Sequence, residues 1–215
     1  MRESIIDKAI EYVKKVFAGD CSGHDYYHTF RVYKLATQIA ESENADIDIV
    51  QLAALLHDVD DRKLSPETYA VRKNAVDFMR ANDVEKQVTE AVCRIIEEVS
   101  FAGEDTVVPE TIEGKCVQDA DRLDAIGAIG IARTFAYGGS RGREMYDPDV
   151  APVKGMGKEE YYQNENSTSI NHFYEKLLLL KDRMNTETAR RLAEHRQVVM
   201  EDFLEEFMAE WEGRK

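Results

Sequence analysis

A histidine–aspartate pair, His57-Asp58, directly follows one of the most apolar stretches of the sequence. Seven of the eight residues from Ile49 to Leu56 are apolar, which predicts a buried segment. A carboxylate at the end of a buried segment costs roughly several kcal/mol unless a partner or a cation neutralises it. An imidazole nitrogen beside a carboxylate oxygen is also a ligand pair that divalent cations accept. The alternative is a helix C-terminus with a capping histidine and a solvated aspartate.

Other histidines and acids have spacings that suit the same chemistry. His24 and His28 are four residues apart at the start of an expected helix, so both can point the same way, and Arg31 shares the side of His28. Asp121 and Asp124 share one face of a later helix. A histidine, the pair His57-Asp58 and a later aspartate would supply four ligands from three helices, leaving two positions of an octahedron open. Taken singly, each acid also fits a capped or solvated carboxylate.

The elements that must position these residues are predicted to be helices throughout. The chain has four prolines and long stretches with Glu, Lys, Arg, Ala and Leu at helical spacing, whereas clean apolar–polar alternation is missing. The fold class is therefore predicted to be all-α. The expected helices span 3–18, 24–41, 46–58, 65–82, 83–99, 111–126, 127–137, 169–184 and 186–211, with caps at Asp46 and Asp83 and a start signal at Ser65-Pro66.

One long segment, 138–166, is predicted to be irregular because it contains several glycines and two prolines. Loops of this length in compact domains are usually functional or disordered, and this one could close over a ligand. The last helix has a predicted core stripe of Ala189, Leu192, Arg196, Val199, Phe203, Phe207 and Trp211. Because no repeat or linker is found, a single domain over 1–215 is predicted.

Composition narrows the function classes. The formal net charge of −14 argues against a nucleic-acid partner, because phosphate binding needs clustered Lys and Arg. Three scattered cysteines, Cys21, Cys93 and Cys116, form no pattern typical of zinc or of a disulfide framework. There is no apolar run of membrane-spanning length and no signal-peptide core at the amino terminus. We therefore expect a cytoplasmic protein without a membrane partner.

Four sequence motifs together resemble the HD-domain superfamily of metal-dependent phosphohydrolases, in particular its small stand-alone bacterial members. They are GHDYYH at 23–28, AALLHD at 53–58, DADRLDAIG at 119–127 and SINHFYEKLL at 169–178. The resemblance extends from about residue 20 to near the carboxyl end. It implies a single-domain helical bundle with the metal site between helices, an HD core at about 20–130, and C-terminal helices over 165–212 that pack on it.

The resemblance also implies the metal ligands, which are His28, His57, Asp58 and Asp121. Asp121 is preferred over Asp119 because the last metal ligand of the family precedes an Arg-Leu pair, as Asp121 does. One divalent ion is implied, with manganese favoured and iron, cobalt, nickel, zinc or magnesium as alternatives. Asp60 departs from the family, where many relatives have a glycine, and would add a negative charge beside the site.

The remaining candidate residues are those that would bind a phosphorylated substrate or act on it. Asp61 or Asp124 would orient or deprotonate water, and His24 would donate a proton to the leaving oxygen. The candidate substrate-binding residues are Arg31, Lys63, Arg122, Arg143, Lys154 and His172.

The resemblance favours a small phosphorylated substrate, in particular a nucleotide, with a nucleoside triphosphate cut to monophosphate and pyrophosphate. Four alternatives stay open at this point. They are a 5′-nucleotidase, a cyclic-nucleotide phosphodiesterase, a regulatory module that binds nucleotide without turnover, and an iron-dependent oxygenase that would need two metal ions.

Overall fold

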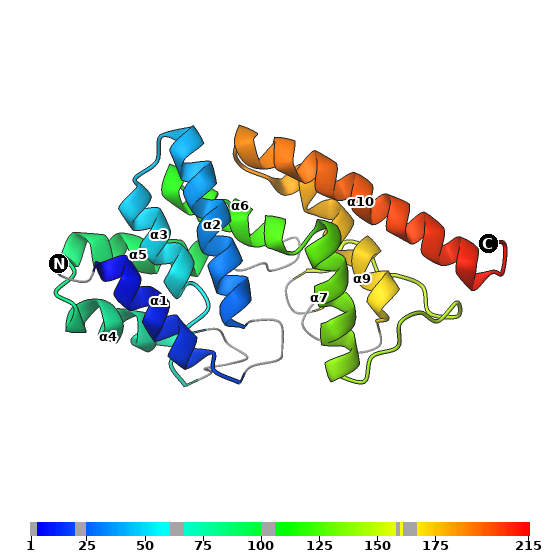
Figure 1. Ribbon diagram of the computed structural model, residues 1–215, viewed down its shortest axis with the longest axis horizontal. Helices are drawn as coiled ribbons and strands as arrows, with labels where there is room; N and C mark the ends of the chain where they lie inside the picture. Colours follow the sequence, from blue (N-terminus) through cyan, green and yellow to red (C-terminus); the bar gives the residue numbers. More distant parts are fainter. Residues whose placement is uncertain (1–3, 20–24, 61–66, 100–105, 158–159, 161–166) are drawn as a thin grey trace. The chain divides into compact units, whose positions relative to one another are not determined.

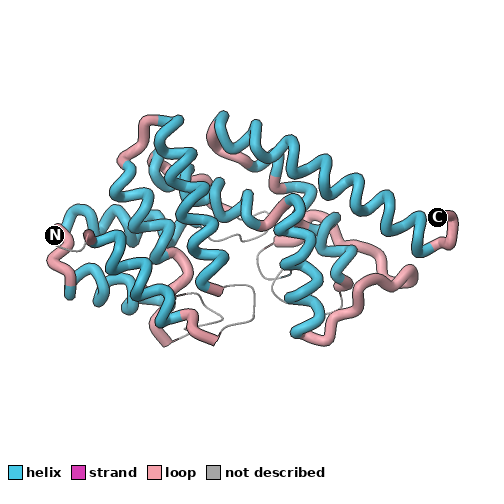
Figure 2. Tube along the Cα trace, viewed as in Figure 1, coloured by secondary structure: helices cyan, strands magenta, loops and turns pink. Residues whose placement is uncertain are grey.

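The computed structural model describes residues 4–19, 25–60, 67–99, 106–157, 160 and 167–215. Every regular element in these ranges is helical, and no strand occurs among them (Figures 1 and 2). The all-α prediction is therefore confirmed. The elements are α1 (Ile5–Val16), α2 (Tyr26–Glu43), α3 (Ile47–Leu56), η1 (Tyr69–Val71), α4 (Lys73–Ala81), α5 (Lys86–Val99), α6 (Ile112–Asp124), α7 (Gly127–Ser140), α9 (Ser169–Glu175), η3 (Leu177–Leu179), η4 (Lys181–Arg183) and α10 (Glu187–Trp211).

The chain divides into two compact units. The first contains the described parts of Met1–Ser100 and Val107–Asp121, and the second contains those of Phe101–Thr106 and Arg122–Lys215. The boundary falls inside α6, between Asp121 and Arg122. That the two units form one domain, with the C-terminal helices packed on an HD core, stays a prediction.

In the first unit, α3 packs against α1, α2 and α5. The predicted burial of its apolar run is confirmed, since Val50 and the residues from Leu52 to Leu56 are at most 3% exposed. The predicted cap is also present: Oδ1 of Asp46 accepts the backbone N–H groups of Asp48 and Ile49 at 3.1 and 3.2 Å. The packing of α3 against three other helices makes its end a rigid support for the histidine that follows it.

Helix α4 begins later than predicted. The start signal at Ser65-Pro66 lies outside the described residues, and the chain from Tyr69 to Val71 is a 3-10 turn. The first residue of α4 is Lys73, because Arg72 adopts a left-handed conformation (φ 49°) that no α-helix can continue. Arg72 provides no side-chain cap. The cap comes instead from a distant carboxylate, as described below.

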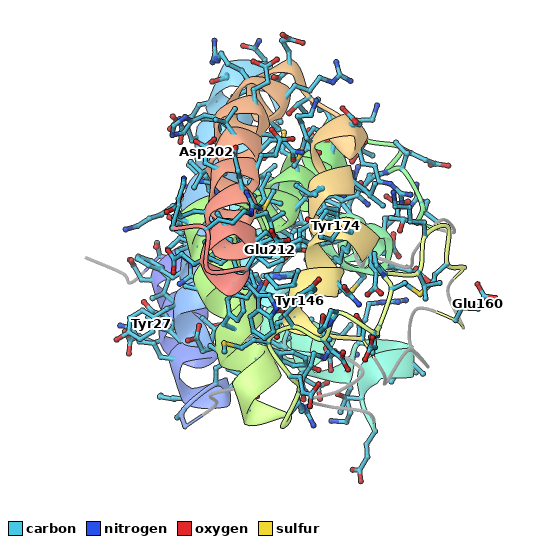
Figure 3. The ribbon with its side chains drawn as sticks, turned by 90° about the vertical axis from the view of Figure 1, so that its right-hand side faces the viewer. Tyr27, Tyr146, Glu160, Tyr174, Asp202 and Glu212 are labelled. Carbon is cyan, nitrogen blue, oxygen red and sulfur yellow. The ribbon has the colours of Figure 1, made fainter. Side chains whose placement is uncertain are left out.

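In the second unit, α10 packs against α7. The predicted stripe is correct at its start and rotated further along, since the buried residues of α10 are Thr188, Ala189, Ala193, Gln197, Met200, Leu204 and Ala209. Trp211, predicted to be core, is 49% exposed. The centroid of its ring nevertheless lies 5.1 Å from that of the Tyr146 ring, in an edge-on arrangement. Figure 3 labels Tyr146 and also Glu212, the residue after Trp211. An aromatic contact therefore links part of the predicted loop to the last helix.

The predicted helix over 169–184 is wrong beyond Glu175. Lys176 leaves the helical region (φ −141°, ψ −59°), and two 3-10 turns follow. The 3-10 geometry aligns residues three apart on one side. This alignment suits the burial of Leu177 and Leu180, which are 2% and 0% exposed.

Much of the described part of the 138–166 segment is fastened to α9. The backbone N–H groups of Ser169 and Ile170 donate to the carbonyls of Glu144 and Met145, both at 2.9 Å. The side-chain amide of Asn171 donates to the carbonyl of Val150 at 2.8 Å. Residues 144–150 are therefore an ordered strap on α9.

The buried carboxylate of Glu175 extends this attachment. It accepts the backbone N–H of Val153 at 3.1 Å and the hydroxyl of Ser167 at 2.7 Å. We predict that Glu175→Ala lowers the free energy of unfolding by about 1–3 kcal/mol, because both donors lose a buried acceptor. Urea denaturation measures the change, and Glu205→Ala, on the exposed face of α10, is the control. Equal stability of the two variants would contradict this role for Glu175.

Among the described residues, no helix is both long enough and apolar enough to cross a membrane.

Candidate metal centre

The predicted metal ligands come together at three helix positions of the first unit. His28 lies in the first turn of α2, His57 follows the last residue of α3, and Asp58 is the next residue. The candidate ligand atoms of these three residues lie within 4.8 Å of one another. Oδ1 of Asp121, on α6, is 3.5 Å from Nε2 of His28 and 4.0 Å from Nε2 of His57. Residues distant in the sequence thus form one cluster.

Each histidine is held by its own helix end. The carboxylate of Asp25 caps α2 by accepting the backbone N–H of His28 at 2.7 Å, which fixes the first turn of that helix. In His57, Nδ1 lies 2.8 Å from the carbonyl oxygen of Ala54, so this nitrogen must carry the proton that it donates. The opposite nitrogen, Nε2, is then available to a cation, which is the usual arrangement of metal-binding histidines.

One buried atom shows that the cluster fits a cation. Among the residues that the structure describes, Nε2 of His57 is buried and has no hydrogen-bond partner, although Oδ2 of Asp58 lies 3.3 Å away. Atoms that share one cation at about 2.1 Å lie about 3.0 Å apart at right angles and about 4.2 Å apart when opposite. The separations of 3.3 to 4.0 Å between the histidine nitrogens and the carboxylate oxygens are in this range. His28, His57 and Asp58 therefore fit a site for one divalent ion, and Oδ1 of Asp121 lies within 4.0 Å of Nε2 of both histidines.

The cluster is buried on one side and more open on the other. The side chains of His28 and His57 are 1% and 3% exposed, whereas that of Asp121 is 28% exposed. Asp121 therefore lies at the rim of the cluster.

Protons and cations compete for His57. Burial lowers the pKa of His57, but the nearby charges of Asp58 and Asp121 and the Ala54 carbonyl raise it overall, from 6.5 to about 9. A cation binds the neutral imidazole, so it must displace this proton. We predict that affinity for Mn²⁺ rises about tenfold per pH unit between pH 6.5 and 9. Calorimetry in buffers of different ionisation enthalpy measures both the affinity and the released proton, and an affinity independent of pH would contradict the prediction.

Asp60, which was expected to add a negative charge beside the site, accepts hydrogen bonds from α4. It is only 3% exposed, and its two oxygens accept the backbone N–H groups of Asn74 and Ala75 at 3.0 and 2.9 Å. Backbone N–H groups in the first turn of a helix have no acceptor within that helix, and the helix dipole favours negative charge beside them. Asp60 therefore supplies the cap that α4 lacks in its own neighbourhood.

Asp124, a candidate for orienting water, is 1% exposed and forms an ion pair with Arg133 at 2.8 Å. The same arginine also donates to the Asp124 carbonyl. Arg122, a candidate for substrate binding, is 5% exposed and donates to the carbonyl of Arg183. These contacts account for part of the bonding capacity of both residues. Their catalytic and binding roles stay predictions.

Arg133 and Arg196 are residues that sequence reasoning missed. Arg196 donates to the carbonyl of Leu123, so two cations meet the carboxyl end of α6, where the helix dipole favours positive charge. The signal for Arg196 was a charged residue within an otherwise apolar stripe. No local signal indicated Arg133.

The other candidates divide by location. Arg31 is a partly exposed residue of α2 in the first unit. Arg143, Lys154 and His172 belong to the second unit, where Lys154 is exposed and the other two are partly exposed. His24, Asp61 and Lys63 lie outside the described residues.

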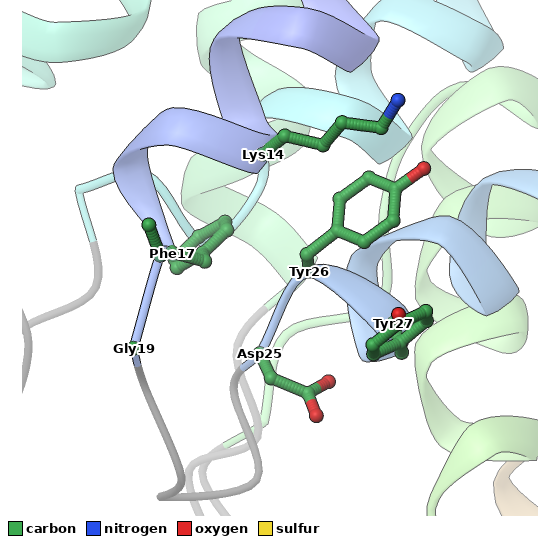
Figure 4. Close-up of a pocket in the computed structure, with 7 residues that line it drawn as sticks. Lys14, Phe17, Gly19, Asp25, Tyr26 and Tyr27 are labelled. Carbon is green, nitrogen blue, oxygen red and sulfur yellow. The ribbon is translucent and has the colours of Figure 1, made fainter.

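A pocket of about 240 Å³ is lined by residues from the end of α1 and the start of α2 (Figure 4). Nζ of Lys14 lies 5.5 Å from the centroid of the Tyr26 ring, and Tyr27 is 67% exposed. Asp25, which also lines the pocket, is the cap that holds His28. The first turn of α2 therefore borders both this pocket and the metal cluster.

Comparisons with known proteins agree with this geometry. The family model of the HD domain matches residues 25–126, which include all four ligand candidates. YpgQ of Bacillus subtilis is 42% identical over 196 residues, covering 90% of this chain and 87% of that protein. The crystal structure of YpgQ in complex with ADP has a TM-score of 0.76 and 38% identity, covering 95% of this chain and 97% of that one.

Two further crystal structures are similar over nearly the whole chain. A protein of Lactobacillus plantarum has a TM-score of 0.86 and 39% identity, with 99% of both chains covered. An HD-superfamily hydrolase of Bacillus thuringiensis has a TM-score of 0.75 and 47% identity, with 96% of both covered. The chain belongs to the HD-domain superfamily, as its motifs predicted. Its fold and family support a hydrolase of the metal-dependent phosphohydrolase type.

Proposed function

We propose that this protein is a metal-dependent phosphohydrolase that cleaves a nucleoside triphosphate to the monophosphate and pyrophosphate. The proposal is carried by the unpaired Nε2 of His57, which lies among a second imidazole and two carboxylates. His28, His57, Asp58 and Asp121 would hold one divalent ion, with manganese as the first choice. When bound, such an ion supplies Lewis acidity toward water and phosphoryl oxygens.

The chain's own groups would orient this chemistry. The Ala54 carbonyl holds the proton of His57 on Nδ1 and so directs Nε2 into the cluster. Asp121, at the exposed rim, would leave room for a phosphoryl group beside it. Asp61 would position the attacking water, and cations such as Arg31 would hold the negative charge that develops on the phosphoryl oxygens. A nucleotide substrate is supported by the ADP complex of the relative YpgQ.

The test is product analysis by ion exchange. Metal-stripped protein is supplied with Mn²⁺ and a pool of nucleoside triphosphates, monophosphates and cyclic nucleotides. Pyrophosphate is the expected product. Inorganic phosphate would indicate a 5′-nucleotidase, and opened cyclic nucleotide a phosphodiesterase. Retained nucleotide without any product would overturn catalysis in favour of a regulatory module, and two metal ions per chain would favour an oxygenase.

The proposal includes a cytoplasmic location and no nucleic-acid or membrane partner. Cell fractionation checks the location. Retention on immobilised DNA or RNA at physiological salt would contradict the expected absence of nucleic-acid binding.

A further inference from the structure

The turn that contains His57 and Asp58 is joined to the start of α4 by hydrogen bonds donated in both directions. Asp58 is followed by Val59 and Asp60, and the carboxylate of Asp60 accepts two backbone N–H groups of the first turn of α4. In return, the side-chain amide of Asn74, from that same turn, donates to the carbonyl of Val59 at 3.0 Å. Three hydrogen bonds thus join residues 59–60 to residues 74–75, which are 14 to 15 positions later.

The attachment has few local substitutes. Helix α4 lacks a side-chain cap of its own, because Arg72 is in the left-handed region. Asn74 also donates to the hydroxyl of Thr68 at 3.2 Å, and its carbonyl accepts the hydroxyl of Tyr12 at 3.4 Å. The first turn of α4 is therefore held by neighbours on both sides. This turn is therefore a fixed attachment point for residues 59–60.

We propose that Asp60 and Asn74 are positioning residues of the metal centre. They anchor the turn after His57 so that the carboxylate of Asp58, two residues before Asp60, faces Nε2 of both histidines at 3.3 Å. The inference rests on the proposed metal site and adds to it the residues that align one of its ligands. Groups that orient metal ligands are typically worth about 10- to 100-fold in metal affinity.

The experiment compares Mn²⁺ affinity, measured by calorimetry and by electron paramagnetic resonance, in four proteins. They are the wild type, Asp60→Ala, Asn74→Ala and Asp46→Ala. Asp46→Ala is the matched control because it also removes a carboxylate that accepts two backbone N–H groups at a helix start, at the opposite end of α3 from His57. It changes the net charge by the same amount.

Asp60→Ala is expected to weaken Mn²⁺ binding about 10- to 100-fold and to broaden the Mn²⁺ spectrum, while Asp46→Ala stays within about twofold of the wild type. Asn74→Ala leaves the charge unchanged and should weaken binding by a smaller factor, which separates positioning from electrostatics. It also carries the test if circular dichroism shows Asp60→Ala to be unfolded.

The outcomes separate the two proposals. Wild-type affinity in both Asp60→Ala and Asn74→Ala, or an equal loss in Asp46→Ala, would overturn the positioning role and leave the metal site intact. A wild-type protein that binds no Mn²⁺ or other divalent ion would overturn the proposed function and the inference together.

Discussion

Replacing Asp58 by alanine is expected to abolish Mn²⁺ binding and to lower the rate of nucleotide hydrolysis by more than about 100-fold. Groups that merely orient ligands are already worth about 10- to 100-fold, and Asp58 is proposed to be a ligand itself. Its carboxylate lies 3.3 Å from Nε2 of both His28 and His57, so the variant removes one of the two proposed carboxylate ligands from the cluster. Metal analysis and steady-state kinetics on the stripped and reloaded protein measure the effect.

The control for this variant is Asp77→Ala, which removes an exposed carboxylate of α4 that pairs with Lys73 at 2.5 Å. It should leave metal content and turnover unchanged. Hydrolysis by Asp58→Ala at a rate near that of the control would show that the reaction does not use this cluster.

The second large effect is expected at Arg133. Because Asp124 is 1% exposed, Arg133→Ala leaves a buried carboxylate without its ion-pair partner. Breaking a buried pair in this way typically costs about 3–5 kcal/mol, and the lower end is expected because Arg133 is 24% exposed and the charge of Arg196 still acts on Asp124. Thermal or urea denaturation measures the loss.

A double variant separates the lost charge from lost packing. Combining Asp124→Asn with Arg133→Ala should recover part of the stability, because the buried charge is then removed as well. Arg191→Ala, at an exposed position of α10, should change stability by less than about 0.5 kcal/mol. A double variant as unstable as Arg133→Ala would assign the loss to packing of the arginine stem.

The parts of this structure that could be predicted are those whose signals are local in sequence. The apolar run before His57 predicted the burial of α3, and Asp46 predicted its cap from residues two and three positions away. The motifs around His28, His57-Asp58 and Asp121 predicted a cluster that the structure brings together, although their role as ligands stays a proposal.

The parts that could not be predicted depend on contacts between distant residues. Asp60 looked like an extra charge beside the metal, because nothing near it in sequence indicated that it would cap a helix 14 residues later. The start of α4 was misplaced for the same reason, since its cap is not adjacent to it. Arg196 reaches a carbonyl 73 residues earlier, a distance at which helical periodicity carries no information.

Residues outside the segment that matches the HD domain form contacts that support this segment. The match begins at residue 25, after α1, yet Ala9 and Val13 of α1 are fully buried, and Tyr12 donates to the carbonyl of Asn74. It ends at residue 126, before Arg133 and Arg196, which satisfy carbonyls at the end of α6. Residues 25–126 on their own would therefore lack the packing of α1 and the cations at the end of α6, and an excised 25–126 peptide is expected to be a poor folding unit.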